Sequence, residues 1–281
     1  MDKEVLIKNI VYLNEKERTL NRLKKAQVRR IAARVRDRLH GLAVLDREGI
    51  GDTLRAVFTY DPREEALTTE LCRELARQMP ELTAAVLFPA HEEVAETPTV
   101  SYMKNAHSER AFHAFAAHMP ALGAVPATTH ADCCGDVYES NSDYCILPLF
   151  TGKDGILTSF CALAEQHELA VHALARVEMA QTGDYTLFAL MKRRCEYLGH
   201  ASHFAFAIHE DLLPQCGEIL CALKKFGARP VKVAPVPLGK ESSGFLYLLV
   251  ADIVHADLTA LLLYLEITVP SYLPYGLFER I

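Results

Sequence analysis

Residues 143–155, with the sequence DYCILPLFTGKDG, contain the apolar run YCILPLF, which predicts a strand. Helical stretches are expected on both sides of it, near 131–139 and over 155–167. Upstream, the short apolar runs TVSYM (99–103) and LGAVPAT (122–128) predict two further strands. Strands that alternate with helices indicate an α/β arrangement for this part of the chain.

The same alternation continues on both sides of this segment. A helix is expected over 108–118, and the runs LAVHALARV (169–177) and DYTLFALMK (184–192) predict two more strands. We therefore expect a mainly parallel sheet with flanking helices, because parallel strands connected through helices are normally covered on both faces.

The first eighty residues predict helices only. Residues 15–40 carry ten Lys or Arg against three acids, with apolar residues at close to helical spacing, which predicts a long amphipathic helix with a basic outer surface. Two more helices are expected near 51–57 and 62–79, the second with Asp61 as its cap and Pro62 as its first residue.

The last eighty residues predict the order strand, helix, strand, strand, helix, strand. The strands are HFAFAI, RPVKVAPVP, GFLYLLVAD and a closing segment, and the helices begin near Leu213 and Ala256. This order is typical of a ferredoxin-like domain.

The composition favours a folded protein without a metal or cofactor. Of 281 residues, 50% are hydrophobic and 23% are charged, and the formal net charge is −6. The eight cysteines contain no C-x-x-C pair, so we expect scattered thiols that act as small apolar residues. The N-terminal stretch does not read as a signal peptide and no apolar run is long enough to span a membrane, so we expect a cytoplasmic protein.

Three segments resemble motifs of prephenate dehydratase. DYCILPLFTGKDG resembles the segment D-Y-G-V-x-P-I-E-N-S-x-x-G, TVSYM with KNAHSERAF resembles the opening strand and its G-x-x-G-x-[FY]-S-x-x-A turn, and DYTLF resembles the T-R-F motif. The matching residues are Asp143, Tyr144, Pro148, Gly155, Ser108, Ala111, Thr186 and Phe188. The resemblance implies one lobe of a periplasmic-binding-protein-like fold over 97–195.

The C-terminal segment 200–281 resembles the ACT domain, which senses phenylalanine in that family. GEILCALKKFGARPVKVAPVP is similar to its G-A-L-x-x-A-L-x-x-F…E-S-R-P sequence. The resemblance places ligand-binding positions at Gly217, Glu218 and Ile219, and it implies a homodimer formed through this domain. Ala234, Pro235 and Val236 replace polar residues of the second motif, which weakens the expectation that phenylalanine binds.

Residues 1–90 resemble the chorismate mutase part of the bifunctional chorismate mutase/prephenate dehydratases. Arg29 and Arg30 in VRRIAARV, with Arg47 and Glu48 in VLDREG, resemble its R-R-x-L-A and D-x-x-R-E elements. In this interpretation the arginines bind the two carboxylates of the substrate and Glu48 accepts its hydroxyl. The alternative is that these charges form a solvated helix face with partners such as Glu17.

The dehydratase motifs have lost most of their polar side chains. Phe150, Thr151 and Gly152 stand at the E-N-S position, and Leu187 stands at the arginine of T-R-F. A hydrophobic side chain cannot replace the guanidinium that pairs with a carboxylate. Thr186 remains as a hydroxyl able to serve as the acid.

The connection between Glu178 and Thr186 is only seven residues long, where the family has its entire second lobe. We therefore interpret the chain as a dehydratase-inactive relative from phenylalanine biosynthesis with a regulatory or scaffolding role, and with an aromatic amino acid, chorismate or prephenate as the possible ligand. Residual chorismate mutase activity is the first alternative. An effector-sensing regulator with a nucleic-acid contact is the second, which the net charge of −6 disfavours.

Overall fold

A computed structural model describes residues 3–89, 96–179, 183–197, 199–237 and 244–281. Its contacts divide the chain into two compact units, residues 1–87 with 259–270, and residues 88–258 with 271–281. The predicted division into 1–90, 97–195 and 200–281 stays a prediction. Within the described residues, no helix is both long and apolar enough to cross a membrane.

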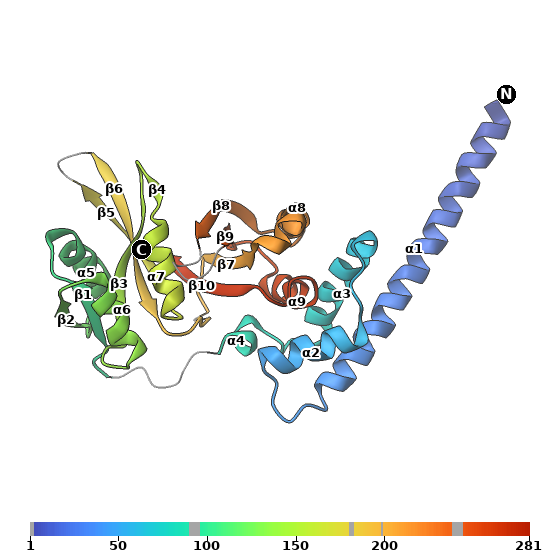
Figure 1. Cartoon of the computed structure of the whole chain (residues 1–281). Coiled ribbons are helices and arrows are strands. Elements are labelled where there is room, and N and C mark those ends of the chain that lie inside the picture. Colours follow the sequence, from blue (N-terminus) through green and yellow to red (C-terminus); the bar gives the residue numbers. More distant parts are fainter. Residues whose placement is uncertain (1–2, 90–95, 180–182, 198, 238–243) are drawn as a thin grey trace. The chain divides into compact units, whose positions relative to one another are not determined.

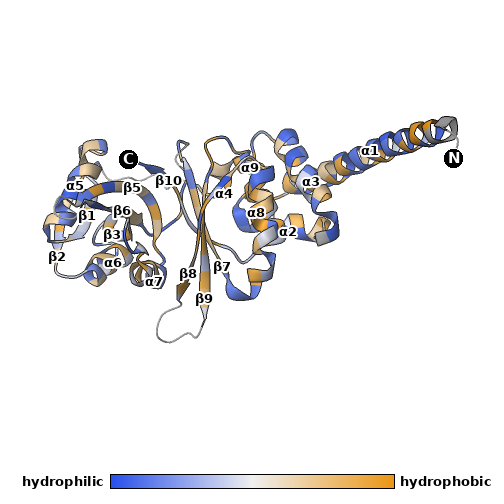
Figure 2. Ribbon diagram, turned by 90° about the horizontal axis from the view of Figure 1, so that it is seen from above, coloured by the Kyte–Doolittle hydropathy of each residue, from blue (hydrophilic) through white to orange (hydrophobic). Residues whose placement is uncertain are grey.

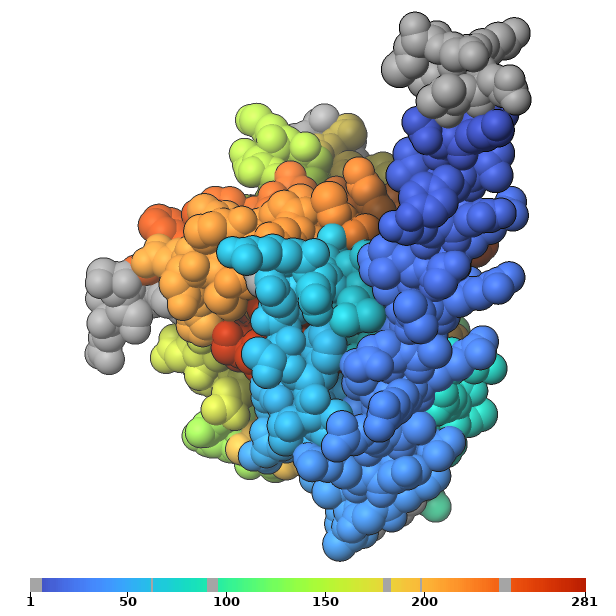
Figure 3. Space-filling view, turned by 90° about the vertical axis from the view of Figure 1, so that its right-hand side faces the viewer, coloured from blue at the N-terminus to red at the C-terminus, as the bar shows by residue number. Residues whose placement is uncertain are grey.

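The first unit is helical, as expected. Its elements are α1 (Lys3–Leu39), α2 (Arg47–Val57), the 3-10 turn η1 (Pro62–Glu64), α3 (Glu65–Gln78), α4 (Ala84–Leu87) and most of α9 (Leu258–Thr268). The long helix begins twelve residues earlier than the basic pattern predicted. Its C-terminal half packs against α2 and α3 and buries Val28, Ala32, Val35 and Leu39, whereas residues 7–27 are exposed (Figure 3).

Side-chain caps fix where the short helices begin. The Asp46 carboxylate accepts a hydrogen bond from the Gly49 backbone N–H at 2.8 Å and starts α2. The Asp61 carboxylate accepts one from the Arg63 N–H at 2.9 Å, with Pro62 in the first turn, so the predicted cap is confirmed.

The second unit is built on one continuous mixed sheet (Figure 1). Its strand order is β2-β1-β3-β6-β5-β10-β7-β9-β8, and the short β4 pairs with β3. The strands are β1 (Thr99–Met103), β2 (Gly123–Ala127), β3 (Tyr144–Thr151), β4 (Gly155–Ile156), β5 (Ala170–Met179), β6 (Asp184–Lys192), β7 (His203–His209), β8 (Arg229–Pro237), β9 (Phe245–Asp252) and β10 (Leu273–Arg280).

The expectation of a mainly parallel sheet was wrong. Among the described strands, only β1 with β2, β1 with β3 and β10 with β5 are parallel, and the other pairs are antiparallel. The reason is the short connection after β5, which cannot hold a crossover helix, so β6 returns antiparallel along β5 from Met179↔Asp184 to Ala170↔Lys192. Residues 180–182 of this connection lie outside the described residues.

The C-terminal part has the predicted ferredoxin-like order. The chain runs β7, η2 (Glu210–Gln215), α8 (Cys216–Lys225), β8, β9, α9 and β10. β10 is antiparallel to β7 and parallel to β5, and thereby joins the two halves of the sheet.

Helices cover both faces of the lobe around β3 and β6 (Figures 1 and 2). α5 (Ala106–His118) buries Phe115 against Phe188 and Leu190 of β6. On the opposite face, α6 (His130–Tyr138) and α7 (Thr158–Gln166) pack near Ala189 and Met191. Successive side chains of β6 thus point to opposite faces of the sheet, as expected for a strand that is buried on both faces.

Replacement of Gly276 by Ala is expected to weaken the junction between β10 and β5. A Cβ at Gly276 would lie 2.4 Å from the Val171 carbonyl oxygen, and the backbone at this position has φ +158°. Overpacking against backbone costs about 1–3 kcal/mol, so the free energy of unfolding of Gly276→Ala should fall by about that amount in chemical denaturation.

The matched control is Gly217→Ala in α8, where no heavy atom lies within 4 Å of the added Cβ. This variant should be neutral or slightly more stable, because Ala favours a helix over Gly by up to about 1 kcal/mol. Wild-type stability of Gly276→Ala would show that the close approach does not constrain the junction.

Candidate functional site

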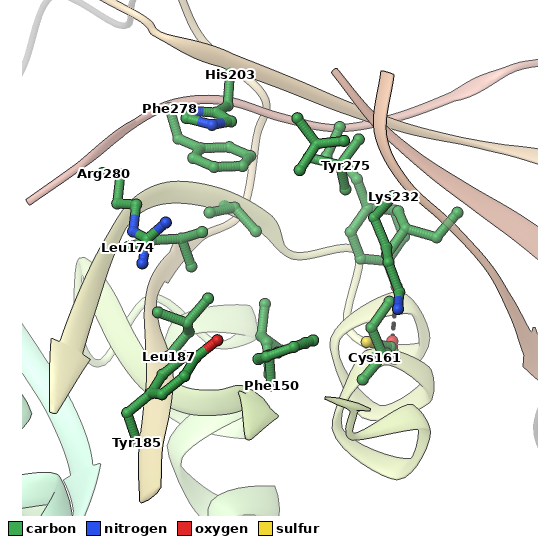
Figure 4. A pocket seen from close by; sticks show the side chains of 17 residues that line it. Phe150, Cys161, Leu174, Tyr185, Leu187, His203, Lys232, Tyr275, Phe278 and Arg280 are labelled. Carbon is green, nitrogen blue, oxygen red and sulfur yellow. Dashed lines mark hydrogen bonds between the residues drawn. The ribbon is translucent and has the colours of Figure 1, made fainter. Parts of the chain in front are cut away.

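A cavity of about 300 Å³ lies within the second unit, between the β3-β6-β5 part of the sheet and the ferredoxin-like strands (Figure 4). Most of its surface is apolar. The residues that line it are Leu149, Phe150, Ile156, Cys161, Val171, Leu174, Tyr185, Leu187, His203, Ala205, Val231, Lys232, Leu248, Val250, Tyr275, Phe278 and Arg280.

One wall of the cavity comes from the segments that resemble dehydratase motifs. Phe150 of β3 and Leu187 of β6 are direct partners across the antiparallel pair, next to the bulge that follows Pro148. The Tyr185 ring stacks on Phe150 with centroids 6.1 Å apart, and the Arg176 guanidinium lies 4.0 Å from the centroid of Tyr185. In Figure 4 the Tyr185 hydroxyl points toward the interior of the cavity.

The opposite wall comes from the ferredoxin-like strands. His203 of β7 stacks on Phe278 of β10, with ring centroids 5.6 Å apart and an interplanar angle of 7°. Arg280 lies two residues after Phe278, and the Lys232 ammonium of β8 lies 5.9 Å from the centroid of the Phe150 ring. Both cations are exposed residues, so they stand where the cavity meets solvent.

The charged groups of the cavity are all cationic. Among the described residues that line it, none carries a carboxylate. Burial lowers the pKa of His203, which favours the neutral imidazole. Burial also raises the pKa of the Cys161 thiol to about 11, which keeps it protonated and unreactive.

The retained motif residues serve the structure of the lobe. The Asp143 carboxylate accepts a hydrogen bond from the Thr99 N–H at 2.7 Å and ties β1 to the start of β3. Tyr144, Ser108 and Ala111 are buried. The residues that match the motifs therefore contribute packing and backbone contacts, whereas Phe150 and Leu187 present apolar side chains.

Thr186 does not line this cavity. It belongs to β6 between Tyr185 and Leu187. Side chains two residues apart on a strand point to the same face of the sheet, so Thr186 lies on the face of Phe188, which packs against α5. It is buried, with 6% of its surface exposed. A catalytic role for Thr186 stays a prediction.

The residues proposed for a mutase site have different surroundings within the helical unit. Arg29 Nε is 4.0 Å from a Glu74 oxygen, while Arg30 and Glu48 are exposed. Arg47 donates to the buried Glu266 carboxylate at 2.5 Å from Nε. Of these mutase candidates only Arg29 lines the groove between α1 and α3.

The ligand-binding positions proposed for the ACT-like region fall in the first turn of α8. Gly217 and Glu218 are exposed, and the side chain of Ile219 is buried in the core. Their role in ligand binding stays a prediction.

Two consecutive cysteines and a third one further along the chain come together in the core. Cys133, Cys134 and Cys145 are buried in the cluster under α6 and α7. In the described part of the chain, no group of three or more His, Cys, Asp or Glu residues is placed to hold a metal ion.

Solved structures of prephenate dehydratases share this fold, although no protein-family model and no curated protein matches the chain. The enzyme from Streptococcus mutans is 18% identical with a TM-score of 0.52, over 66% of this chain and 99% of that chain. The enzyme from Staphylococcus aureus subsp. aureus Mu50 is 12% identical with a TM-score of 0.50, over 64% and 99%. The fold is similar to that of prephenate dehydratase. A third structure, the Arthrobacter aurescens enzyme in complex with L-Phe, is 13% identical with a TM-score of 0.49, over 65% and 90%.

Several residues of the cavity carried no recognisable signal in the sequence. His203, Lys232 and Arg280 lie on three strands of the C-terminal region. His203 and Arg280 belong to none of the quoted motifs, and Lys232 lies in the ACT-like segment outside its proposed ligand-binding positions. Only the register that places β10 beside β5 brings them opposite Phe150 and Leu187. The one available sequence signal for these residues was a cationic residue at the end of an apolar strand, as at Arg280.

The contact between Arg47 and Glu266 predicts a structural role for this arginine. Arg47→Met leaves a carboxylate that is only 5% exposed without its guanidinium partner. Loss of one partner of a buried pair costs about 3 kcal/mol, so the free energy of unfolding should fall by about this amount. Chemical denaturation followed by circular dichroism measures it.

Arg38→Met, in the exposed last turn of α1, is the matched control and should leave stability unchanged. The double variant Arg47→Met with Glu266→Met should recover most of the loss, because it removes the buried carboxylate together with the guanidinium. Equal stability of Arg47→Met and Arg38→Met would disprove the structural role.

Proposed function

We propose that this chain is a relative of prephenate dehydratase that has lost the dehydratase reaction and acts as a regulatory or scaffolding protein in aromatic amino acid biosynthesis. The observation that carries the proposal is the chemistry of the cavity at the motif positions. Phe150 and Leu187 form an apolar wall there, and among the described lining residues no carboxylic acid can protonate a departing hydroxyl.

The shortened connection supports the same proposal. β5 and β6 form an antiparallel hairpin where a second lobe would be inserted. A dehydratase needs groups on both sides of its substrate to orient it and to exclude water. Here the ferredoxin-like strands occupy the opposite side, and they contribute mostly apolar side chains.

The finer parts of the proposal come from the resemblance. An aromatic amino acid is the proposed ligand of Gly217, Glu218 and Ile219 in α8. The proposed assembly is a homodimer through the ferredoxin-like region, and the proposed location is the cytoplasm. These features fit a protein that senses a product without making it.

Purified protein is expected not to accelerate the conversion of prephenate to phenylpyruvate. Formation of phenylpyruvate, followed by its absorbance in alkali, should equal the rate without protein. Folding of the sample is checked by its thermal melt. Turnover that disappears in Thr186→Val, a variant of nearly equal volume, would contradict the proposal and assign the acid to Thr186.

Residual chorismate mutase activity is the alternative, and the groove between α1 and α3 is its specific support. This groove has a volume of about 830 Å³ and includes Lys24, Lys25, Arg29 and Arg63. Glu64, Glu70 and Glu74 line it as well, and carboxylates repel a dianionic substrate.

We therefore expect chorismate to disappear at its spontaneous rate in the presence of the protein. The decrease of chorismate absorbance measures this rate for the wild type, Arg30→Ala and Arg47→Ala, with Arg29→Ala added because Arg29 lines the groove. A wild-type rate above background that falls in these variants and persists in the exposed-helix control Arg38→Ala would establish the mutase alternative.

A further inference from the structure

The cavity of the second unit has the features of a binding site, whether or not any reaction occurs there. Its volume of about 300 Å³ is at the lower end of the range for small-molecule sites, which is roughly 300–1,000 Å³. Both walls belong to one compact unit, and β10 pairs with strands of both. The cavity is therefore formed within a single folded body.

Two pairs of aromatic rings face this cavity from opposite walls. His203 and Phe278 stack on one side, and Phe150 and Tyr185 stack on the other (Figure 4). Aliphatic side chains such as Leu174 lie between them. Flat apolar groups are favoured in such surroundings because ring faces contact one another well and bury apolar area.

The polar groups of the cavity select an anion. Arg280 and Lys232 supply the cationic side chains, and Tyr185 directs a hydroxyl inward. Within the described part of the chain, neither cation forms an ion pair with a carboxylate. Both are consequently available to a ligand, and the guanidinium offers two parallel donors that fit a carboxylate.

The same lining selects against an ammonium group. An ammonium buried beside Leu187 and Val250 would find no carboxylate among the described lining residues and would lie close to Arg280 and Lys232. The cost of desolvating such a charge without a partner is large.

We propose that this cavity binds a small aromatic monocarboxylate that carries no ammonium group. The aromatic ring lies between the two stacked pairs, and the carboxylate pairs with Arg280. Lys232, which lies on the other side of the opening in Figure 4, adds to the positive potential that attracts the anion. The binding role does not depend on whether the chain converts prephenate, and it involves other residues than the positions in α8.

Isothermal titration of the full chain with three probes tests the ligand class. 3-Phenylpropanoate has the ring and the carboxylate, 3-phenylpropanamide lacks the charge, and L-phenylalanine adds the ammonium. The first should bind at least about tenfold more tightly than the other two at this site, since a hydrogen bond to a charged group is worth about this factor or more. Its affinity should fall as salt is added.

Variants locate the site. Arg280→Gln should weaken binding of 3-phenylpropanoate by about tenfold, and Lys232→Gln by less, whereas the exposed control Lys224→Gln in α8 should have no effect. Leu187→Trp should fill the cavity and abolish binding, with Leu213→Trp on the surface as its control. Thermal melts establish that each variant is folded.

Four outcomes would overturn the proposal. They are absence of binding by 3-phenylpropanoate, equal affinity for the amide, tighter L-phenylalanine binding that depends on Arg280, and wild-type affinity in the double variant Arg280→Gln with Lys232→Gln. If Leu187→Trp fails to fold, the double variant still tests the site, because both cations are exposed and their replacement leaves the core intact.

Discussion

The parallel pairing of β10 with β5 is the interaction on which the second unit depends. Only a short stretch is paired, with Glu279 opposite Ala173 and Arg280 opposite Leu174, and the Ile281 N–H donates to the Leu174 carbonyl at 2.7 Å. The approach of the two strands is close enough that Gly276 leaves no room for a side chain beside Val171. Through this pairing an α/β lobe and a ferredoxin-like region share one sheet.

The shared sheet explains how the α/β lobe encloses a cavity. The β5-β6 hairpin forms one side of the cavity, and the ferredoxin-like strands cover it from the other side. Their inward surface is apolar, with cations at the opening. Phe150 and Leu187 fit this environment, because polar side chains facing an apolar wall would lose hydration without gaining partners.

In the helical unit, charged residues connect helices that are far apart in the chain. The guanidinium of Arg47 contacts the Glu266 carboxylate, and Arg55 donates to the Glu266 carbonyl oxygen at 2.9 Å. Two arginines of α2 thereby hold α9, whose residues 260–267 are all buried. A residue that resembles part of a catalytic motif is thus engaged in joining segments that are far apart in the chain.

The sequence by itself determined the elements. Apolar periodicity and the cap at Asp61 are local properties, and they predicted most helices and strands and the ferredoxin-like order. It did not determine the strand directions after β3, the face on which Thr186 lies, or the joining of the two halves of the sheet. Only the tertiary structure decided these, because the register of strands distant in sequence, such as β10 beside β5, depends on how whole surfaces pack and leaves no pattern within either strand.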